Sequence, residues 1–170
     1  MSSRAAYAVG FLACAGLLAF AYYLQYFQNQ EPCPLCILQR VAFLDMMIVF
    51  AVAAMHGPKR RGAVVYSGLL LVMTAMGAGI AGRQVWLQHL PPDKVPACGP
   101  GLEYMLERFP LGEALRKIFA GSGECAEAGW RFLDLPIAGW SLLWFVLLGA
   151  LAIYAAIRAQ RARAPGSGAR

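Results

Sequence analysis

Four long apolar blocks constrain the fold of this chain more than any other feature. They fall at about residues 5–27, 37–55, 63–81 and 137–157, and each is close to the roughly 20 helical residues that cross about 30 Å of hydrocarbon. The chain is 59% hydrophobic and only 14% charged, whereas a soluble domain has about 25% charged residues. The blocks are too long for strands, and their apolar residues do not alternate with polar ones. The sequence therefore predicts an all-α membrane protein, a four-transmembrane-helix bundle.

The distribution of basic residues predicts how this bundle is oriented. With four spans, the N-terminal segment, the loop after the second span and the C-terminal tail share one side of the membrane. These segments hold Arg4, Lys59, Arg60, Arg61, Arg158, Arg161, Arg163 and Arg170. The short loop on the opposite side, residues 28–32, has no Lys or Arg. The positive-inside rule then places both termini in the cytoplasm. The formal net charge of +6 is thus a topology signal, and no nucleic-acid partner is expected.

Residues 1–157 are predicted to form one membrane domain, with a long outer loop at residues 82–136 between the third and fourth spans. A loop of this length is rarely structureless, and we expect residues 102–119 to be helical with a break near residues 110–112. The second half of this helix has an apolar face, which suits either the membrane surface or the loop's own core. Residues 158–170 are predicted to be a disordered cytoplasmic tail.

Two pairs of cysteines face the outer compartment in this topology. Cys33-Pro34-Leu35-Cys36 stands at the entry to the second span, and Cys98 and Cys125 lie in the long loop. Disulfides persist in an oxidising outer compartment but not in the cytosol, so charge and cysteine chemistry agree on the orientation. Pro34 suits the first helical position, which makes Cys33 the N-cap and places Cys36 in the first turn. The positive helix end favours a thiolate there.

Arg40 is the charged residue closest to this motif within the second span. It follows Cys36 by one helical turn and lies on the same face. Helical side chains lean toward the N-terminus, so the guanidinium is predicted to point back toward Cys36 and to stabilise its thiolate. An arginine inside a membrane helix is costly, and it indicates a functional site. The simpler interpretation is that Arg40 extends to the lipid headgroups.

The cysteines also admit two less specific interpretations. A CxxC motif occurs in zinc sites, but Cys98 and Cys125 do not form a second CxxC, and His56 and His89 lie on opposite membrane faces. No metal is therefore expected. Cys98 and Cys125 could form a purely structural disulfide. Their glycine-rich neighbouring segments instead suit sulfurs that must meet different partners in turn.

Three further features of the spans carry structural predictions. Asp45, deep in the second span, is predicted to make a polar contact facing the bundle. Cys14, deep in the first span, is predicted to be a small packing residue. The third span contains glycines that would let neighbouring helices approach closely, namely Gly68, Gly77, Gly79 and Gly82.

Taken together, these residues resemble the DsbB family of bacterial disulfide bond formation proteins. The resemblance extends from about residue 5 to residue 157. Its motifs are the Cys33–Cys36 CxxC with Arg40 in the second span, Cys98 and Cys125 between the third and fourth spans, and residues 102–106 and 109–112 of the loop. It implies a thiol:quinone oxidoreductase of the bacterial inner membrane, which maintains disulfide formation by reoxidising a DsbA-like periplasmic protein of thioredoxin fold.

The resemblance also implies a role for each site residue. Reduced DsbA would attack the Cys98–Cys125 disulfide and form a mixed disulfide with Cys98, after which Cys125 would exchange with Cys33. Cys36 would then be released as a thiolate and pass two electrons to a ubiquinone or menaquinone from the membrane pool. Arg40 matches the family's quinone-contacting arginine. His89, near the same outer boundary, would assist in binding the quinone or would be an ordinary interfacial histidine.

Two other classes of four-span protein remain as alternatives. A tetraspanin-like scaffold also has a long second outer loop with disulfides, but it normally carries a Cys-Cys-Gly motif, which is absent here. A vitamin K epoxide reductase-like enzyme also uses a quinone. The position of Cys98 and Cys125 between spans three and four, rather than between spans one and two, disfavours that class.

Overall fold

The computed structural model describes residues 2–95, 104, 107–120, 123–126 and 130–161 of the 170-residue chain. Its elements, in chain order, are α1 (Ser3–Phe27), α2 (Pro34–His56), α3 (Arg60–Gln88), the short 3-10 helix η1 (Pro92–Lys94), α5 (Leu111–Ala120), α6 (Gly123–Ala126), β1 (Arg131–Phe132), β2 (Leu135–Pro136) and α7 (Ile137–Arg161). Within the described residues, four helices are long and apolar enough to cross a membrane: α1, α2, α3 and α7. The predicted four-helix membrane fold is confirmed.

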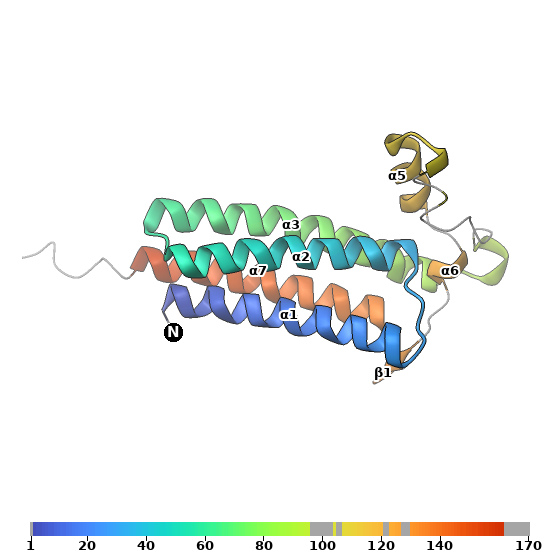
Figure 1. The fold of residues 1–170 in the computed structure, drawn as a ribbon, viewed down its shortest axis with the longest axis horizontal. Helices are drawn as coiled ribbons and strands as arrows, with labels where there is room; N and C mark the ends of the chain where they lie inside the picture. Colours follow the sequence, from blue (N-terminus) through green and yellow to red (C-terminus); the bar gives the residue numbers. More distant parts are fainter. Residues whose placement is uncertain (1, 96–103, 105–106, 121–122, 127–129, 162–170) are drawn as a thin grey trace, which may run out of the picture.

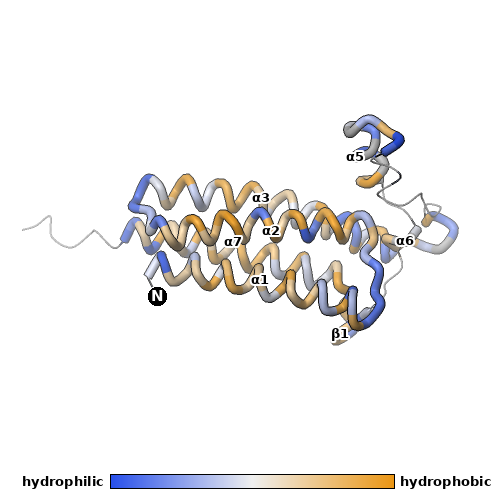
Figure 2. Tube along the Cα trace, viewed as in Figure 1, coloured by the Kyte–Doolittle hydropathy of each residue, from blue (hydrophilic) through white to orange (hydrophobic). Residues whose placement is uncertain are grey.

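The four long helices lie side by side as an antiparallel bundle (Figure 1). Helix α3 contacts both α7 and α2, and α1 contacts both α2 and α7. The N-terminus, the α2–α3 turn and the end of α7 share one end of the bundle, and the loop elements gather at the other end (Figure 1). Hydrophilic residues concentrate at the two ends, whereas the middle of the bundle is mainly apolar (Figure 2). This is the pattern expected of helices that span hydrocarbon.

Helix α2 begins and ends where its sequence predicts. Cys33 is the N-cap with an extended backbone, and its sulfur accepts a hydrogen bond from the backbone N–H of Cys36, while Pro34 occupies the first turn. Proline suits this position because its missing N–H would have no helical partner. At the other end, Gly57 adopts a left-handed conformation at φ 57°, which glycine tolerates without strain. The predicted N-cap role of Cys33 is confirmed.

The core is built from large aromatic side chains that lie against small residues. Phe145 of α7 is fully buried, and its ring stacks on Phe43 of α2 with the centroids 4.1 Å apart. A Cβ built on Gly77 would lie 2.3 Å from Phe145, so only glycine leaves room for this ring. Cys14 is also fully buried in this core. Its predicted role as a packing residue is confirmed.

Two predictions about the spans need correction. A Cβ built on Gly68, Gly79 or Gly82 would meet no atom within 4 Å, so only Gly77 of the four predicted glycines allows a close helix contact. Asp45 is exposed on the surface of α2 instead of facing the bundle. Its neighbours Phe43 and Met46 are the residues of this turn that face the core. The helical periodicity therefore turns Asp45 outward.

The outer loop departs from its prediction at its start and agrees with it further on. Helix α3 continues to Gln88, beyond the end predicted at residue 81. The predicted helix at residues 102–119 lies partly outside the described residues, but its described part has the predicted interruption, because residues 109–110 are not helical and α5 begins at Leu111. Ile118 of α5 is buried in an apolar cluster at the entry to α2, whereas Phe119 is half exposed. This helix therefore packs on the bundle through Ile118.

A small hairpin precedes α7 and was not foreseen from the sequence. Strands β1 and β2 pair antiparallel, and Leu133 and Asp134 between them have φ values of 51° and 60°. Two consecutive residues with positive φ match a type I′ turn, which is common in two-residue hairpin loops. Trp140 of α7 fixes the hairpin because its indole N–H donates a hydrogen bond of 3.1 Å to the carbonyl of Phe132.

Candidate active site

Three cysteine sulfurs meet where the outer loop folds onto the start of α2. The sulfurs of Cys33 and Cys36 lie 2.8 Å apart. Cys125, carried by α6, is fully buried and belongs to the same apolar cluster as Cys33. The other buried members of this cluster are Leu35, Ile80, Leu87 and Ile118. The fold therefore brings together three of the four cysteines predicted to react, while Cys98 lies outside the described residues.

The contacts of Cys33 change its acidity. Its thiol has a raised pKa, first because of its side-chain hydrogen bond with Cys125, then because of that with Cys36 and because of burial. Burial without a compensating charge disfavours a thiolate. Cys33 is thus held as the neutral member of the cluster. A neutral thiol is a poor attacking group, because the thiolate is the nucleophile in disulfide exchange.

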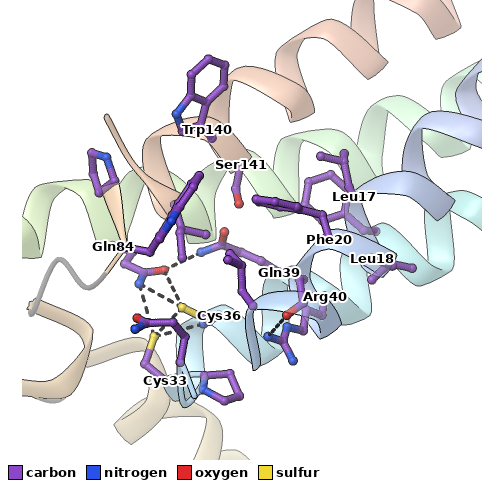
Figure 3. A pocket seen from close by; sticks show the side chains of 18 of the residues that line it. Leu17, Leu18, Phe20, Cys33, Cys36, Gln39, Arg40, Gln84, Trp140 and Ser141 are labelled. Carbon is purple, nitrogen blue, oxygen red and sulfur yellow. Dashed lines mark hydrogen bonds between the residues drawn. The ribbon is translucent and has the colours of Figure 1, made fainter. Parts of the chain in front are cut away.

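Two buried glutamines that are hydrogen-bonded to each other lie beside the CxxC motif, and one of them contacts both sulfurs (Figure 3). The amide nitrogen of Gln84, on α3, donates to Cys33 at 3.3 Å and to Cys36 at 3.2 Å. The amide nitrogen of Gln39, on α2, donates to the Gln84 oxygen at 2.6 Å. Both side chains are only 3% exposed. Sequence reasoning missed this pair, although two uncharged amides facing the interior of apolar helices are a signal that could have drawn notice.

The structure places Arg40 differently from its prediction. Its guanidinium donates hydrogen bonds to the side-chain oxygen of Gln25 and, at 3.1 Å, to the backbone carbonyl of Ala21. It also lies 5.2 Å from the centre of the Tyr22 ring. These three partners all belong to α1, and Figure 3 shows the guanidinium directed away from the sulfurs. The predicted approach of Arg40 to Cys36 is corrected, since Gln84 is the side chain that donates to this sulfur.

A cavity of about 860 Å³ opens beside the CxxC motif. Its walls come from α1, α2, α3, the β1–β2 hairpin and α7, and they include Cys33, Cys36, Gln39, Arg40, Gln84 and Gln88 together with many aliphatic and aromatic side chains. A mainly apolar cavity of this size, with a few converging polar groups, is typical of a small-molecule site. The side-chain oxygen of Gln88 is buried and has no hydrogen-bond partner among the described residues.

His89 lies outside this cavity's lining. It caps the end of α3, its side chain is exposed, and its Nδ1 lies 2.7 Å from the carbonyl of Val85. A ring nitrogen that is hydrogen-bonded to a carbonyl of its own helix is not available to bind a ligand. The geometry therefore gives no support to the predicted binding role of His89, whereas Arg40 does line the cavity.

Comparison with known proteins identifies the family. The family model described as "Disulfide bond formation protein DsbB" matches residues 3–155. The chain belongs to the DsbB family. It is 54% identical over 154 residues to the "Disulfide bond formation protein B" of Nitrosococcus oceani, covering 91% of each chain. It is 52% identical over 161 residues to the protein of that name from Hahella chejuensis, covering 95% of this chain and 98% of the relative.

The family assignment connects the three-sulfur cluster with disulfide chemistry. Members of the DsbB family are disulfide bond formation proteins, and this DsbB-family protein is accordingly a multi-pass membrane protein with disulfide-generating oxidoreductase activity. The assignment favours an enzyme over the tetraspanin-like scaffold. Adjacent cysteines in a partly buried cluster are what a disulfide-exchange enzyme requires.

Proposed function

We propose that this DsbB-family protein oxidises a DsbA-like periplasmic protein of thioredoxin fold and passes the electrons to a membrane quinone. The observation that carries the proposal is that Cys125 of the loop meets Cys33, while Cys36 beside it lines the apolar cavity. One end of the sulfur cluster thus connects to the outer loop, and the other connects to a lipid-level binding site. This is the arrangement a relay between a soluble protein and a membrane-soluble acceptor needs.

The sulfur relay follows from these contacts. The partner's thiolate attacks the Cys98–Cys125 disulfide, forms a mixed disulfide with Cys98 and releases Cys125. The Cys125 thiolate then attacks Cys33, which breaks the Cys33–Cys36 bond and releases Cys36 as a thiolate. The partner's second thiol resolves its mixed disulfide with Cys98, and Cys98 then attacks Cys125. The loop disulfide is restored, and Cys33 and Cys36 hold the two electrons of the partner's dithiol.

The cavity suits a quinone. Its apolar walls match a quinone ring and tail, and the Arg40 guanidinium and the unpartnered Gln88 oxygen offer a donor and an acceptor at its polar edge. Arg40 and Gln88 are the residues that would hold the head group. When bound, a quinone supplies an acceptor for two electrons and two protons. Cys33 and Cys36 yield both as they close to a disulfide.

Redox energies explain why a strong acceptor is required. DsbA has a potential near −120 mV and a thioredoxin-like CxxC one near −270 mV, so an ordinary CxxC would oxidise DsbA uphill by about 150 mV, or about 7 kcal/mol. A membrane quinone offsets this deficit. The position of Cys36 at the wall of a mainly apolar cavity agrees with such an acceptor.

The proposed location is the bacterial inner membrane, with both termini in the cytoplasm. Arg4, the Lys59–Arg61 turn, Arg158 and Arg161 all belong to the end of the bundle opposite the sulfur cluster. The positive-inside rule assigns that end to the cytoplasm. The cysteines then face the periplasm, where disulfides persist.

The proposal is tested by anaerobic mixing of the purified protein with a ubiquinone or menaquinone and a reduced DsbA-like partner, followed by measurement of quinol. We expect catalytic quinol formation by the natural protein, and by Cys14→Ala, because Cys14 is a core residue remote from the sulfur cluster. Cys36→Ser should abolish it. Quinol formation that persists in Cys36→Ser, or that is absent from the natural protein with both quinones, would refute the proposal.

A further inference from the structure

The carboxamide of Gln84 bridges the two sulfurs of the CxxC motif. One amide nitrogen lies 3.3 Å from the Cys33 sulfur and 3.2 Å from the Cys36 sulfur. Its two hydrogens can therefore serve both sulfurs at once. The amide oxygen is also within reach of the Cys36 thiol, at 3.6 Å. Gln84 can thus accept from Cys36 when this cysteine is a thiol and donate to it when it is a thiolate.

Burial makes these contacts energetically significant. Gln84 is 3% exposed and faces the interior between α2 and α3, so bulk water does not compete with it for the sulfurs. A hydrogen bond to a charged group is worth more than a neutral one, and it is strengthened in a medium of low dielectric constant. Any negative charge that forms on Cys36 at this place requires a local donor, because burial of an uncompensated charge is costly.

From this geometry we infer that Gln84 is a catalytic residue: its amide N–H stabilises the thiolate that forms on Cys36 during disulfide exchange, and Gln39 positions the amide. The Gln39 nitrogen donates to the Gln84 oxygen at 2.6 Å, which turns the Gln84 nitrogen toward the sulfurs. The inference rests on the proposed function, since it concerns the exchange step that precedes electron transfer to the quinone.

The step is balanced without any further reactant. The Cys125 thiolate attacks the Cys33 sulfur, the Cys125–Cys33 bond forms, and the Cys33–Cys36 bond breaks. The electron pair of the broken bond remains on the Cys36 sulfur as negative charge. No proton is transferred in this step. The Gln84 N–H shifts from a hydrogen bond shared by two sulfurs to one that favours the charged Cys36.

Arg40, the residue that sequence reasoning assigned to this task, is engaged elsewhere. Its guanidinium hydrogen bonds go to Gln25 and Ala21 on α1. Among the described residues, Gln84 is the side chain with a nitrogen donor bonded to the Cys36 sulfur. Gln84 therefore donates to the Cys36 sulfur, while Arg40 is held by α1 and lines the cavity.

The inference can be tested without quinone or partner protein, by measuring the reactivity of Cys36 alone. The full chain is prepared in lipid nanodiscs with Cys14, Cys33, Cys98 and Cys125 each replaced by alanine, so that Cys36 is the remaining thiol. The rate of its alkylation by iodoacetamide is measured as a function of pH. This rate follows the fraction of thiolate.

Gln84→Met keeps the length of the side chain but removes both N–H donors. We expect the pH profile of alkylation to move up by about one unit, which is about a ten-fold slower reaction below the midpoint. Gln39→Met should move the pH profile of alkylation in the same direction by a smaller amount, because the Gln84 amide is then still present but is no longer held in position by Gln39. Thr74→Val is the matched control on α3, since Thr74 is buried and lies far along the helix from the sulfurs. It should leave the profile unchanged.

Two results would overturn the inference. The first is a Gln84→Met profile that matches that of the parent protein. The second is a shift in Thr74→Val as large as that in Gln84→Met, which would reveal general loosening of α3. If Gln84→Met does not fold, as judged by gel filtration, Gln39→Met decides the question by the same criterion. Absence of quinol formation by the natural protein would refute the proposed function, yet the alkylation profile would still decide the role of Gln84.

Discussion

Replacement of Gly77 by alanine should destabilise the bundle at the contact that shapes the cavity. The added Cβ would lie 2.3 Å from Cε1 of Phe145, whereas carbon atoms in favourable contact are about 3.5–4.0 Å apart. Phe145 is fully buried and stacks on Phe43 at 4.1 Å, so its ring cannot move without displacing Phe43. Phe43 in turn lines the cavity. Relief of the clash therefore requires either α3 or the whole aromatic pair to move by more than about 1 Å.

The expected cost is that of overpacking a core, about 1–3 kcal/mol. Gly79→Ala supplies the matched control two residues along the same helix, because a Cβ there would meet no atom within 4 Å. At that position alanine should stabilise the helix by about 0.5–1 kcal/mol, through its lower conformational entropy in the unfolded chain. The same chemical change is thus expected to have opposite signs at Gly77 and Gly79.

The assay is thermal unfolding in detergent micelles, followed by circular dichroism. For a chain of this size each kcal/mol corresponds to about 2–4 °C in Tm, so Gly77→Ala should lower Tm by about 2–12 °C and Gly79→Ala should raise it by about 1–4 °C. Quinol formation should fall in Gly77→Ala, since Phe43 is displaced at the cavity wall. A Gly77→Ala protein as stable as Gly79→Ala would refute the packing argument.

Two further predictions concern the site. Arg40→Ala should raise the KM for quinone about ten-fold or more through loss of a charged donor, with a smaller effect on kcat, as measured by steady-state quinol formation; an unchanged KM would remove Arg40 from the binding site. Cys33 should resist alkylation at pH 8 in the reduced protein, because its raised pKa keeps it protonated. Cys125→Ala removes the largest cause of that shift, so the pKa should fall and Cys33 should be alkylated faster, as measured by mass spectrometry. An equal or slower rate in Cys125→Ala would contradict this account of the cluster.

Hydropathy and local helix chemistry were sufficient for most of the fold. A block of about 20 apolar residues has few alternatives to a membrane helix, because every backbone polar group must be satisfied within the segment. The N-cap role of Cys33 could likewise be predicted, since it depends on Pro34 and on the unpaired N–H groups of one helix end. Such features depend on residues close together in the chain.

The wrong predictions concern the direction of a side chain that can contact more than one helix. Arg40 follows Cys36 by one turn, but its hydrogen bonds are to Gln25 and Ala21 of α1. The spacing within α2 carries no information about a carbonyl on α1. Asp45 was predicted to face the bundle and is exposed, because the residues of α2 that face the bundle are fixed by packing against α1 and α3.

The order of the residues alone predicted that four helices cross a membrane, and that a CxxC stands at the entry to one of them. These properties follow from hydrophobic length and from backbone hydrogen bonding, which act locally. The contact of Cys125 with Cys33 was expected only from the family resemblance, whereas the contacts of Gln84 with both sulfurs came from the three-dimensional packing. Gln84 is 48 residues from Cys36 in the chain, and no local rule relates them. Their meeting depends on the register in which α3 and the loop pack against α2. That register is set by close packing such as that of Phe145, which contacts Gly77 of α3 and stacks on Phe43 of α2.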